Sequence, residues 1–217
     1  MSFRYALKNY IVEPQLYPDE VLFFDSHAVI IKDAFPKSQF HFLILPRDLE
    51  LTQTNPVFLS AEQKNKFQCY VDWALTRVFE DFTKKYTLVG ERMLPFENKH
   101  QFKDKQFFID SFTQVGIHSI PSLRNLHIHV MTKDFYSDRM KNKKHYNSFN
   151  TTFFVSWSGL PLEESPDATY LENEIIKKTD LKCCYCKKNF KNRFSELKLH
   201  LDHEFKARFV DQRRLNT

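Results

Sequence analysis

Glycine is scarce in this sequence. Only three of the 217 residues are glycine, Gly90, Gly116 and Gly159, against a usual content of about 7%. Neither a G-x-G-x-x-G nor a G-x-x-x-x-G-K-[ST] pattern can be written with glycines so far apart, and these loops hold phosphates in Rossmann and P-loop proteins. Both of those nucleotide-binding classes are therefore excluded.

Long hydrophobic runs and a disulfide framework are missing too. No apolar run approaches the roughly 18 residues of a membrane-spanning helix, and residues 1–11 carry charges and tyrosines where a secretory signal would be apolar. Cys69 stands alone, whereas Cys183, Cys184 and Cys186 lie together, which indicates a metal site in a reducing compartment. We expect an intracellular protein without a membrane partner.

Aromatic residues are abundant. The chain has 23 phenylalanines, 42% hydrophobic residues and a mean hydropathy of −0.51. This composition supplies the core of one domain with a small appendage, and it argues against intrinsic disorder.

Positive charge is concentrated at the C-terminal end. Residues 182–217 contain ten Lys or Arg and four Asp or Glu, so this tail carries the whole net positive charge of the chain, which is +5. Such asymmetry is typical of proteins that bind a polyanion, with nucleic acid as the leading candidate. A merely solvated basic tail is the alternative.

Periodicity predicts an α+β domain with a mainly antiparallel sheet and flanking helices. Ser60 to Gln63 form a capping box that opens a helix with the apolar stripe Phe67, Val71, Leu75, Val78 and Phe82, and we expect Cys69 beside this stripe to be in the core. Further helices are predicted at residues 2–11 and 168–178, strands at 28–33, 40–46, 107–111, 115–120, 125–132 and 152–157, and loops at 97–105 and 133–150.

Two histidines share one face of the predicted strand at 125–132. The strand period of two places His127 and His129 on the face opposite Leu126 and Ile128, and His118 lies nine residues upstream. A neutral imidazole can attack phosphorus and carry the adduct when a neighbour fixes its tautomer. A half-buried surface pair and a metal site are the alternatives.

The segment Asn125-Leu-His-Ile-His-Val-Met131 resembles the H-φ-H-φ-H-φ-φ motif of the histidine-triad (HIT) nucleotide hydrolases and transferases, and within them the aprataxin branch. Residues 33–46, 116–122 and 141–149 are similar to the same branch. The resemblance implies a HIT-like catalytic domain with an N-terminal helix at residues 1–165 and a helix plus zinc finger at 166–217. It also implies the short form, without the forkhead-associated domain of longer aprataxins.

The resemblance assigns a role to each matching residue. His127 would be the nucleophile that takes up AMP, His129 would bind the phosphate beside it, and His118 would assist the leaving phosphate. The implied nucleotide-binding residues are Asp33, which would hold the ribose hydroxyls, Lys37, His41 and Ser122, and the implied DNA-binding residues are Phe3, Lys141, Lys144 and His145. Ser122, Lys144 and His145 would grip DNA phosphates. If the motif is left aside, each of four of these residues has a plain structural interpretation. Asp33 would cap a turn, Lys37 would be a solvated lysine, His41 would be a strand histidine with its hydrogen bonds made within the protein, and Lys144 would be part of a solvated loop.

Asn125 departs from the family pattern, which has histidine at the first triad position. Asn125 shares the face of His127, so we expect its amide to hydrogen-bond the neighbouring imidazole or the backbone. The departure affects a supporting position and leaves the nucleophile position intact.

A second constellation has the spacing of a ββα zinc finger, Cys183-x-x-Cys186, thirteen residues, then His200. On a helix, Glu204 lies one turn after His200, and its gap fits finger spacing better than that of His203. We predict the ligands Cys183, Cys186, His200 and Glu204, with His203 in reserve and Cys184 as a strained substitute for Cys183. The resemblance implies the same Cys₂-His-Glu set. The alternative is that these cysteines are free thiols that bind no metal. The zinc is expected to be structural, because so small a core would not fold alone.

Together these features predict a DNA-repair hydrolase that removes AMP from adenylated 5′ ends left by abortive ligation. A covalent AMP-histidine intermediate would form, without a catalytic metal, and a 5′-phosphate would remain. We expect the protein to bind nicked or broken double-stranded DNA and the product AMP, and to be a monomer. We expect it in the nucleus, with the cytoplasm as a second location. Guanylated ends are a further expected substrate. The alternatives are a hydrolase of AMP-lysine or dinucleoside polyphosphates, and a nucleic-acid-binding module without activity.

Overall fold

A six-stranded sheet forms the centre of the computed structural model, which describes residues 3–89 and 95–214. The strand order is β1-β2-β3-β6-β5-β7, and each neighbouring pair is antiparallel. The strands are β1 (Val21–Phe24), β2 (Ala28–Lys32), β3 (His41–Pro46), β5 (Thr113–His118), β6 (Ile128–Thr132) and β7 (Phe154–Ser156). The predicted antiparallel α+β sheet is confirmed.

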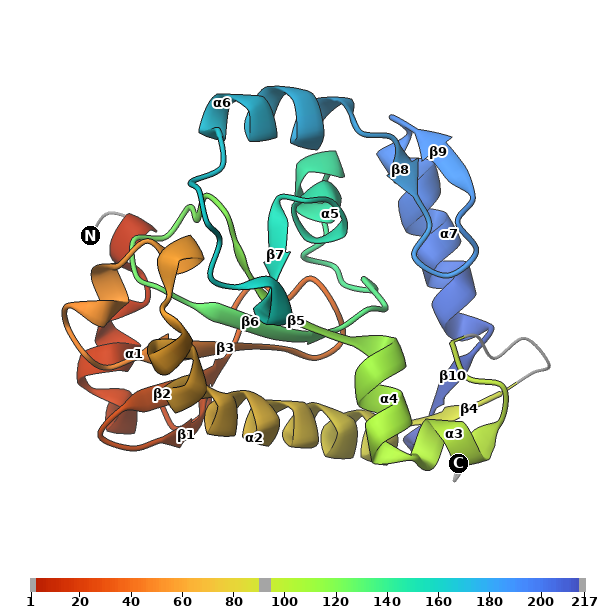
Figure 1. Ribbon diagram of the computed structural model, residues 1–217. Coiled ribbons are helices and arrows are strands. Elements are labelled where there is room, and N and C mark those ends of the chain that lie inside the picture. The colour runs from red at the N-terminus through yellow and green to blue at the C-terminus, as the bar shows by residue number, and fades with distance from the viewer. Residues whose placement is uncertain (1–2, 90–94, 215–217) are drawn as a thin grey trace.

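Helix α2 (Ala61–Lys85) covers one face of this sheet (Figure 1). It begins at the predicted capping box, in which the hydroxyl of Ser60 accepts from Gln63 N and the side chain of Gln63 accepts from Ser60 N. Four residues of the predicted stripe are buried and Leu75 is partly buried. The prediction for Cys69 was wrong, because two residues beyond Phe67 a side chain points about 200° around the helix, into solvent.

The opposite face of the sheet is covered by several smaller elements (Figure 1). Helix α1 (Lys8–Val12) packs against the first three strands through Leu7 and Ile11, whereas α5 (Lys143–Asn150) lies over β5 and β7. The catalytic histidines predicted above lie on this face.

The other helical segments are short. Among the described residues they are α3 (Lys99–Lys103), α4 (Lys105–Phe112), α6 (Ala168–Tyr170), the π-helical η6 (Leu171–Ile176), and the 3₁₀ turns η1 (Phe3–Tyr5), η2 (Pro14–Leu16), η3 (Leu51–Gln53), η4 (Pro56–Phe58), η5 (Trp157–Gly159) and η7 (Gln212–Arg214).

Several predicted elements were wrong. Residues 107–111, predicted as a strand, belong to α4, because Asp104 caps the main-chain N–H of Phe107 at 2.7 Å and Phe108 and Phe112 bury one helical face. An apolar run as short as this one fits the helical period of 3.6 residues as well as the strand period of two. The predicted loops at 97–105 and 133–150 contain α3 and α5, and β1 was not predicted. The helix predicted at 168–178 is α6 continued by η6.

Gly116 permits a close approach of β5 and β7. A Cβ atom at this position would lie 2.2 Å from the carbonyl oxygen of Val155 and 2.8 Å from the ring of Phe154. Gly116 is also paired with His129 across the neighbouring ladder. Because Gly116 has no side chain, β5 and β7 can pair directly beside the histidines.

The C-terminal tail folds as two strands, β8 (Leu181–Lys182) and β9 (Asn189–Lys191), followed by α7 (Phe194–Lys206). Its last strand, β10 (Phe209–Asp211), pairs with β4 (Tyr86–Leu88) at the end of α2, as Figure 1 shows. The ring of Phe209 lies 5.1 Å from that of Phe82 in the main core. The tail thus shares the core of the larger domain, although its small size led us to expect an appendage. Among the described residues no helix is both long and apolar enough to span a membrane.

Candidate functional site

Four histidines converge on the sheet face that α2 leaves free. His41 comes from β3, His129 from β6, and His118 from the end of β5, while His127 directly precedes β6. The ring centroid of His129 lies 4.7 Å from that of His118, 4.9 Å from that of His127 and 5.1 Å from that of His41. The predicted catalytic residues are therefore brought together, and His41 joins them.

One ring nitrogen of His127 has no hydrogen-bond partner among the described residues. Its Nδ1 lies 2.7 Å from the main-chain carbonyl oxygen of Asn125. Because a carbonyl only accepts, Nδ1 carries the proton and Nε2 keeps its lone pair. The amide of Asn125 does not make this contact: its Nδ2 donates to the hydroxyl of Thr52 at 3.2 Å. The backbone thus supplies the tautomer control that we expected from the amide.

A chain of hydrogen bonds sets the tautomers of His41 and His129. The main-chain N–H of Lys37 donates to Nδ1 of His41 at 3.2 Å, so the proton of His41 is on Nε2, which lies 2.8 Å from Nδ1 of His129. His129 is then left with its proton on Nε2. That atom is buried and has no partner among residues 3–89 and 95–214. The chain therefore presents an N–H donor to whatever binds between His127 and His129.

Burial keeps these imidazoles neutral. It lowers the pKa of His41 to about 4, although the nearby Asp33 carboxylate acts in the opposite direction. The pKa values of His118 and His129 fall well below the usual range, because burial and the neighbouring imidazoles disfavour a positive charge, and burial also lowers the pKa of His127. A neutral His127 can act as a nucleophile at physiological pH.

The same burial predicts acid sensitivity. A histidine whose folded pKa is depressed binds fewer protons than in the unfolded chain, so stability is lost as pH falls from about 6.5 towards 4. His41 alone contributes a loss of about 2 to 3 kcal/mol over that window. Urea unfolding at pH 7.5, 6 and 5 should show the midpoint falling, and less steeply for His41→Gln. Equal slopes for wild type, His41→Gln and the exposed-site control His100→Gln would contradict this reading.

The loop between β2 and β3 carries two of the four predicted nucleotide-binding residues, Asp33 and Lys37, and a third, His41, begins β3. Asp33 Oδ1 accepts from the main-chain N–H of Phe35 at 2.8 Å, so Asp33 does cap a turn, while its Oδ2 lies 3.3 Å from His41 Nδ1. The ammonium of Lys37 donates to the carbonyl of Phe35 and its charge depresses the pKa of His41, His118 and His129. Asp33 and Lys37 therefore lie at the edge of the histidine cluster.

The predicted DNA-binding residues are less concentrated. Ser122 is exposed on the connection from β5 to β6, and Lys141 is exposed just before α5. His145, on the first turn of α5, accepts through Nδ1 from the N–H of Lys141 at 3.2 Å. The ammonium of Lys144 forms a salt bridge of 2.8 Å with Glu172, which DNA would have to replace. The side chain of Phe3 lies outside the described part of the chain.

Phe149 is a site residue that sequence reasoning missed. Its ring centroid lies 4.5, 5.2 and 5.5 Å from those of His118, His129 and His41. The ring therefore holds three imidazoles in place from α5. Phe149 belongs to the segment 141–149, which is part of the family resemblance. No local pattern in the sequence indicates, however, that this helical phenylalanine packs against His129, 20 residues earlier in the chain.

The predicted zinc ligands also converge. One donor atom from each of Cys183, Cys186, His200 and Glu204 lies within 4.8 Å of the others. Cys186 Sγ is 3.2 Å and Glu204 Oε1 is 3.0 Å from His200 Nε2, close to the roughly 3.5 Å between ligands of a tetrahedral zinc ion. His203 is exposed and does not join this group. The donor set and spacing therefore fit zinc.

Arg208 is a second residue that the sequence reasoning missed. Its guanidinium donates to Oε2 of Glu204 and, at 2.8 Å, to the main-chain carbonyl of Glu204, while it lies 4.5 Å from the ring centroid of Tyr185. This contact leaves Oε1 of Glu204 facing His200. The i,i+4 spacing of Glu204 and Arg208 was the available signal.

Comparisons with known proteins agree with this geometry. A model of the HIT domain matches residues 15–136, more than half of the chain, and a model of the C2HE/C2H2/C2HC zinc-binding finger matches residues 150–207. An aprataxin-like protein from Saccharomyces cerevisiae is 47% identical over 96% of this chain and 99% of its own length, and one from Schizosaccharomyces pombe is 32% identical over 94% of this chain and 82% of its own length. The chain belongs to the aprataxin branch of the histidine-triad family. The crystal structure of aprataxin ortholog Hnt3 in complex with DNA is similar at a TM-score of 0.68 and 33% identity, covering 94% of both chains. The family resemblance, the HIT fold and the C-terminal C2HE finger are confirmed.

Proposed function

We propose that this HIT hydrolase removes AMP from the adenylated 5′ ends of nicked or broken DNA. The observation that carries the proposal is the free Nε2 of His127 beside the unpartnered Nε2–H of His129, an attacking lone pair next to a donor for a phosphoryl oxygen. The DNA complex of the similar Hnt3 structure supports DNA as the partner.

The reaction would proceed through two displacements at phosphorus. Nε2 of His127 forms a bond to the AMP phosphorus, and the bond from that phosphorus to the oxygen of the DNA 5′-phosphate breaks. The positive charge that develops on the imidazole is stabilised by the Nδ1–H bond to the carbonyl of Asn125. Water then attacks the phosphorus and gives up one proton to solvent, the P–N bond breaks, and its electron pair returns to Nε2, so that AMP is released and neutral His127 is restored. His118, whose ring centroid lies 4.7 Å from that of His129, would assist the leaving phosphate.

We infer that no metal acts at the histidine cluster. Donor atoms of His118, His127 and His129 lie within 4.8 Å of one another, as a metal site would require. However, the hydrogen-bond chain from Lys37 through His41 leaves a proton on Nε2 of His129, and a protonated nitrogen has no lone pair for a metal. The same proton suits an anionic phosphate.

We also propose that zinc is held by Cys183, Cys186, His200 and Glu204 and has only a structural role. Zinc would fix the turn after β8 to α7. The basic finger and the residues before α5 would then face the DNA backbone, a sequence-independent grip whose affinity falls steeply with salt.

The substrate is tested by competition. Purified wild-type protein is given adenylated nicked duplex and AMP-lysine, separately and together, and AMP and the 5′-phosphate end are quantified. We expect kcat/KM to be at least about 10-fold higher for the DNA, and guanylated nicked duplex, tested in parallel, to be cleaved too. A preference for AMP-lysine that adenylated DNA does not inhibit would favour the alternative, a hydrolase of small nucleotide conjugates.

A further inference from the structure

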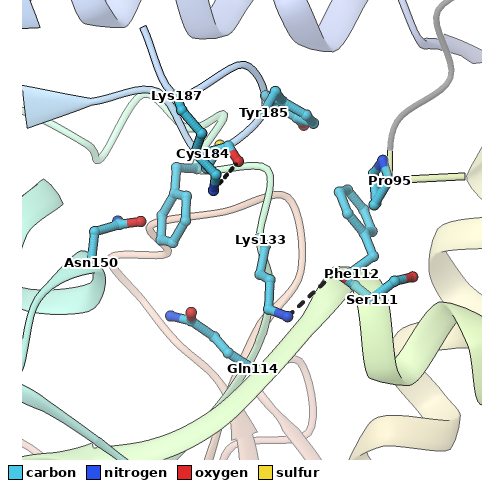
Figure 2. Close-up of a pocket in the computed structure, with 10 residues that line it drawn as sticks. Pro95, Ser111, Phe112, Gln114, Lys133, Asn150, Cys184, Tyr185 and Lys187 are labelled. Carbon is cyan, nitrogen blue, oxygen red and sulfur yellow. Dashed lines mark hydrogen bonds between the residues drawn. The ribbon is translucent and has the colours of Figure 1, made fainter. Parts of the chain in front are cut away.

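A cavity of about 380 Å³ lies where the finger meets the HIT domain. Figure 2 shows that both modules line it, with Gln114 and Lys133 from the HIT domain and Cys184, Tyr185 and Lys187 from the finger. The volume falls within the range of roughly 300 to 1,000 Å³ that small-molecule sites occupy. None of the four clustered histidines lines it, so within the described chain it is separate from the active site.

Two lysines bring like charges to this cavity, one from each module. The ammonium of Lys133 donates to the carbonyl of Ser111 at 3.3 Å, and that of Lys187 donates to the carbonyl of Cys184 at 2.9 Å, as the dashed lines in Figure 2 mark. Lys133 also donates to the carbonyl of Asp110 at 3.5 Å. Because each ammonium has three donors, one on Lys133 and two on Lys187 remain after the bonds named here. Burial and the nearby charge of Lys187 lower the pKa of Lys133, and Asp110 offsets this only in part.

The backbone at Lys187 belongs to a tight turn of the finger. Its φ is 62°, in the left-handed region where glycine is the usual residue. Its N–H donates to the carbonyl of Cys183 at 3.0 Å, so the turn holds this conformation firmly. The turn therefore fixes the backbone position from which the Lys187 side chain extends along the cavity.

A neutral donor at the cavity lacks a good partner. Among the described residues, the amide nitrogen of the half-buried Gln114 reaches the carbonyl of Phe149 at 3.5 Å and the sulfur of Met131 at 3.6 Å, both at the limit of a hydrogen bond. This amide can therefore donate to a group that enters the cavity.

We propose that this cavity binds a phosphate group between Lys133 and Lys187. A phosphate offers several acceptor oxygens and enough negative charge to neutralise both ammonium groups, with the amide of Gln114 as a further donor. Its source is either free phosphate or a phosphodiester of bound DNA. In both cases the bound group would fasten the finger to the HIT domain. The inference does not depend on AMP removal.

Thermal unfolding of the zinc-loaded full chain in inorganic phosphate, at constant ionic strength, tests the proposal. The wild type should gain roughly 3 to 5 °C at a phosphate concentration ten times Kd. Lys133→Met and Lys187→Met should lose at least half of this gain, whereas Lys133→Arg and Lys187→Arg should keep it. Lys182→Met, an exposed charge removal on the same finger, is the matched control and should behave as wild type.

Binding of nicked duplex distinguishes the two sources. If a DNA phosphodiester occupies the cavity, the two methionine variants should bind duplex about 10-fold more weakly than Lys182→Met. If free phosphate is the occupant, all three should bind duplex equally and only the thermal gain should change. Equal thermal gains in wild type and the methionine variants, together with equal duplex binding, would overturn the proposal. The proposed removal of AMP would stand in that case.

Discussion

His127→Ala is expected to release AMP from adenylated nicked duplex at least about 10⁴-fold more slowly than wild type, because removing a nucleophile removes the covalent route altogether. The rate to measure is that of a single turnover with enzyme in excess, which isolates the chemistry from product release. The fold should survive, since the His127 ring makes its hydrogen bond to a main-chain carbonyl and belongs to none of the apolar clusters.

Two controls make this result specific. His100→Ala removes an exposed imidazole elsewhere and should leave the rate unchanged. Binding of unadenylated nicked duplex should be similar for wild type and His127→Ala, which separates lost chemistry from lost substrate. A His127→Ala protein that retains a tenth of the wild-type rate would show that another group attacks the phosphorus.

Cys186→Ser is expected to lower the thermal midpoint by roughly 10 to 20 °C, and a strong chelator should do the same to wild type. Loss of a structural zinc ion removes the cross-link between the turn after β8 and helix α7. Phe205, at the end of α7, and Phe209, in β10, pack in the main core around Phe82. Loosening the finger should therefore weaken the whole domain.

His203→Ala is the matched control for the zinc site, because it lies on the same helix next to Glu204 but is exposed. This variant should bind one equivalent of zinc and unfold at the wild-type temperature, whereas Glu204→Ala should bind zinc more weakly. If His203→Ala loses zinc and Glu204→Ala keeps it, the assignment of the fourth ligand is wrong.

The motif residues were predictable because their chemistry is local in sequence. Alternation along a strand is enough to bring His127 and His129 to one face, and helical spacing is enough to align His200 with Glu204. The capping box at Ser60 and the stripe of α2 were predictable for the same reason. In each case the partners lie within a few residues of one another.

What could not be predicted depends on contacts between distant segments. The bond between His41 and His129 joins residues 88 positions apart, and it decides which nitrogen of His129 carries the proton. The Asn125 contact was expected from the amide, but that amide turns to Thr52, far away in the sequence. The sharing of core between finger and HIT domain arises from the pairing of β10 with β4, which no local pattern indicates.

The most direct measurement is mass spectrometry of the protein quenched during turnover of adenylated nicked duplex. The proposed mechanism predicts a protein heavier by one adenylyl group, with the modification on the peptide that contains His127 and absent from His127→Ala. An adenylyl group on a different residue, or full turnover with no labelled protein at any quench time, would contradict it.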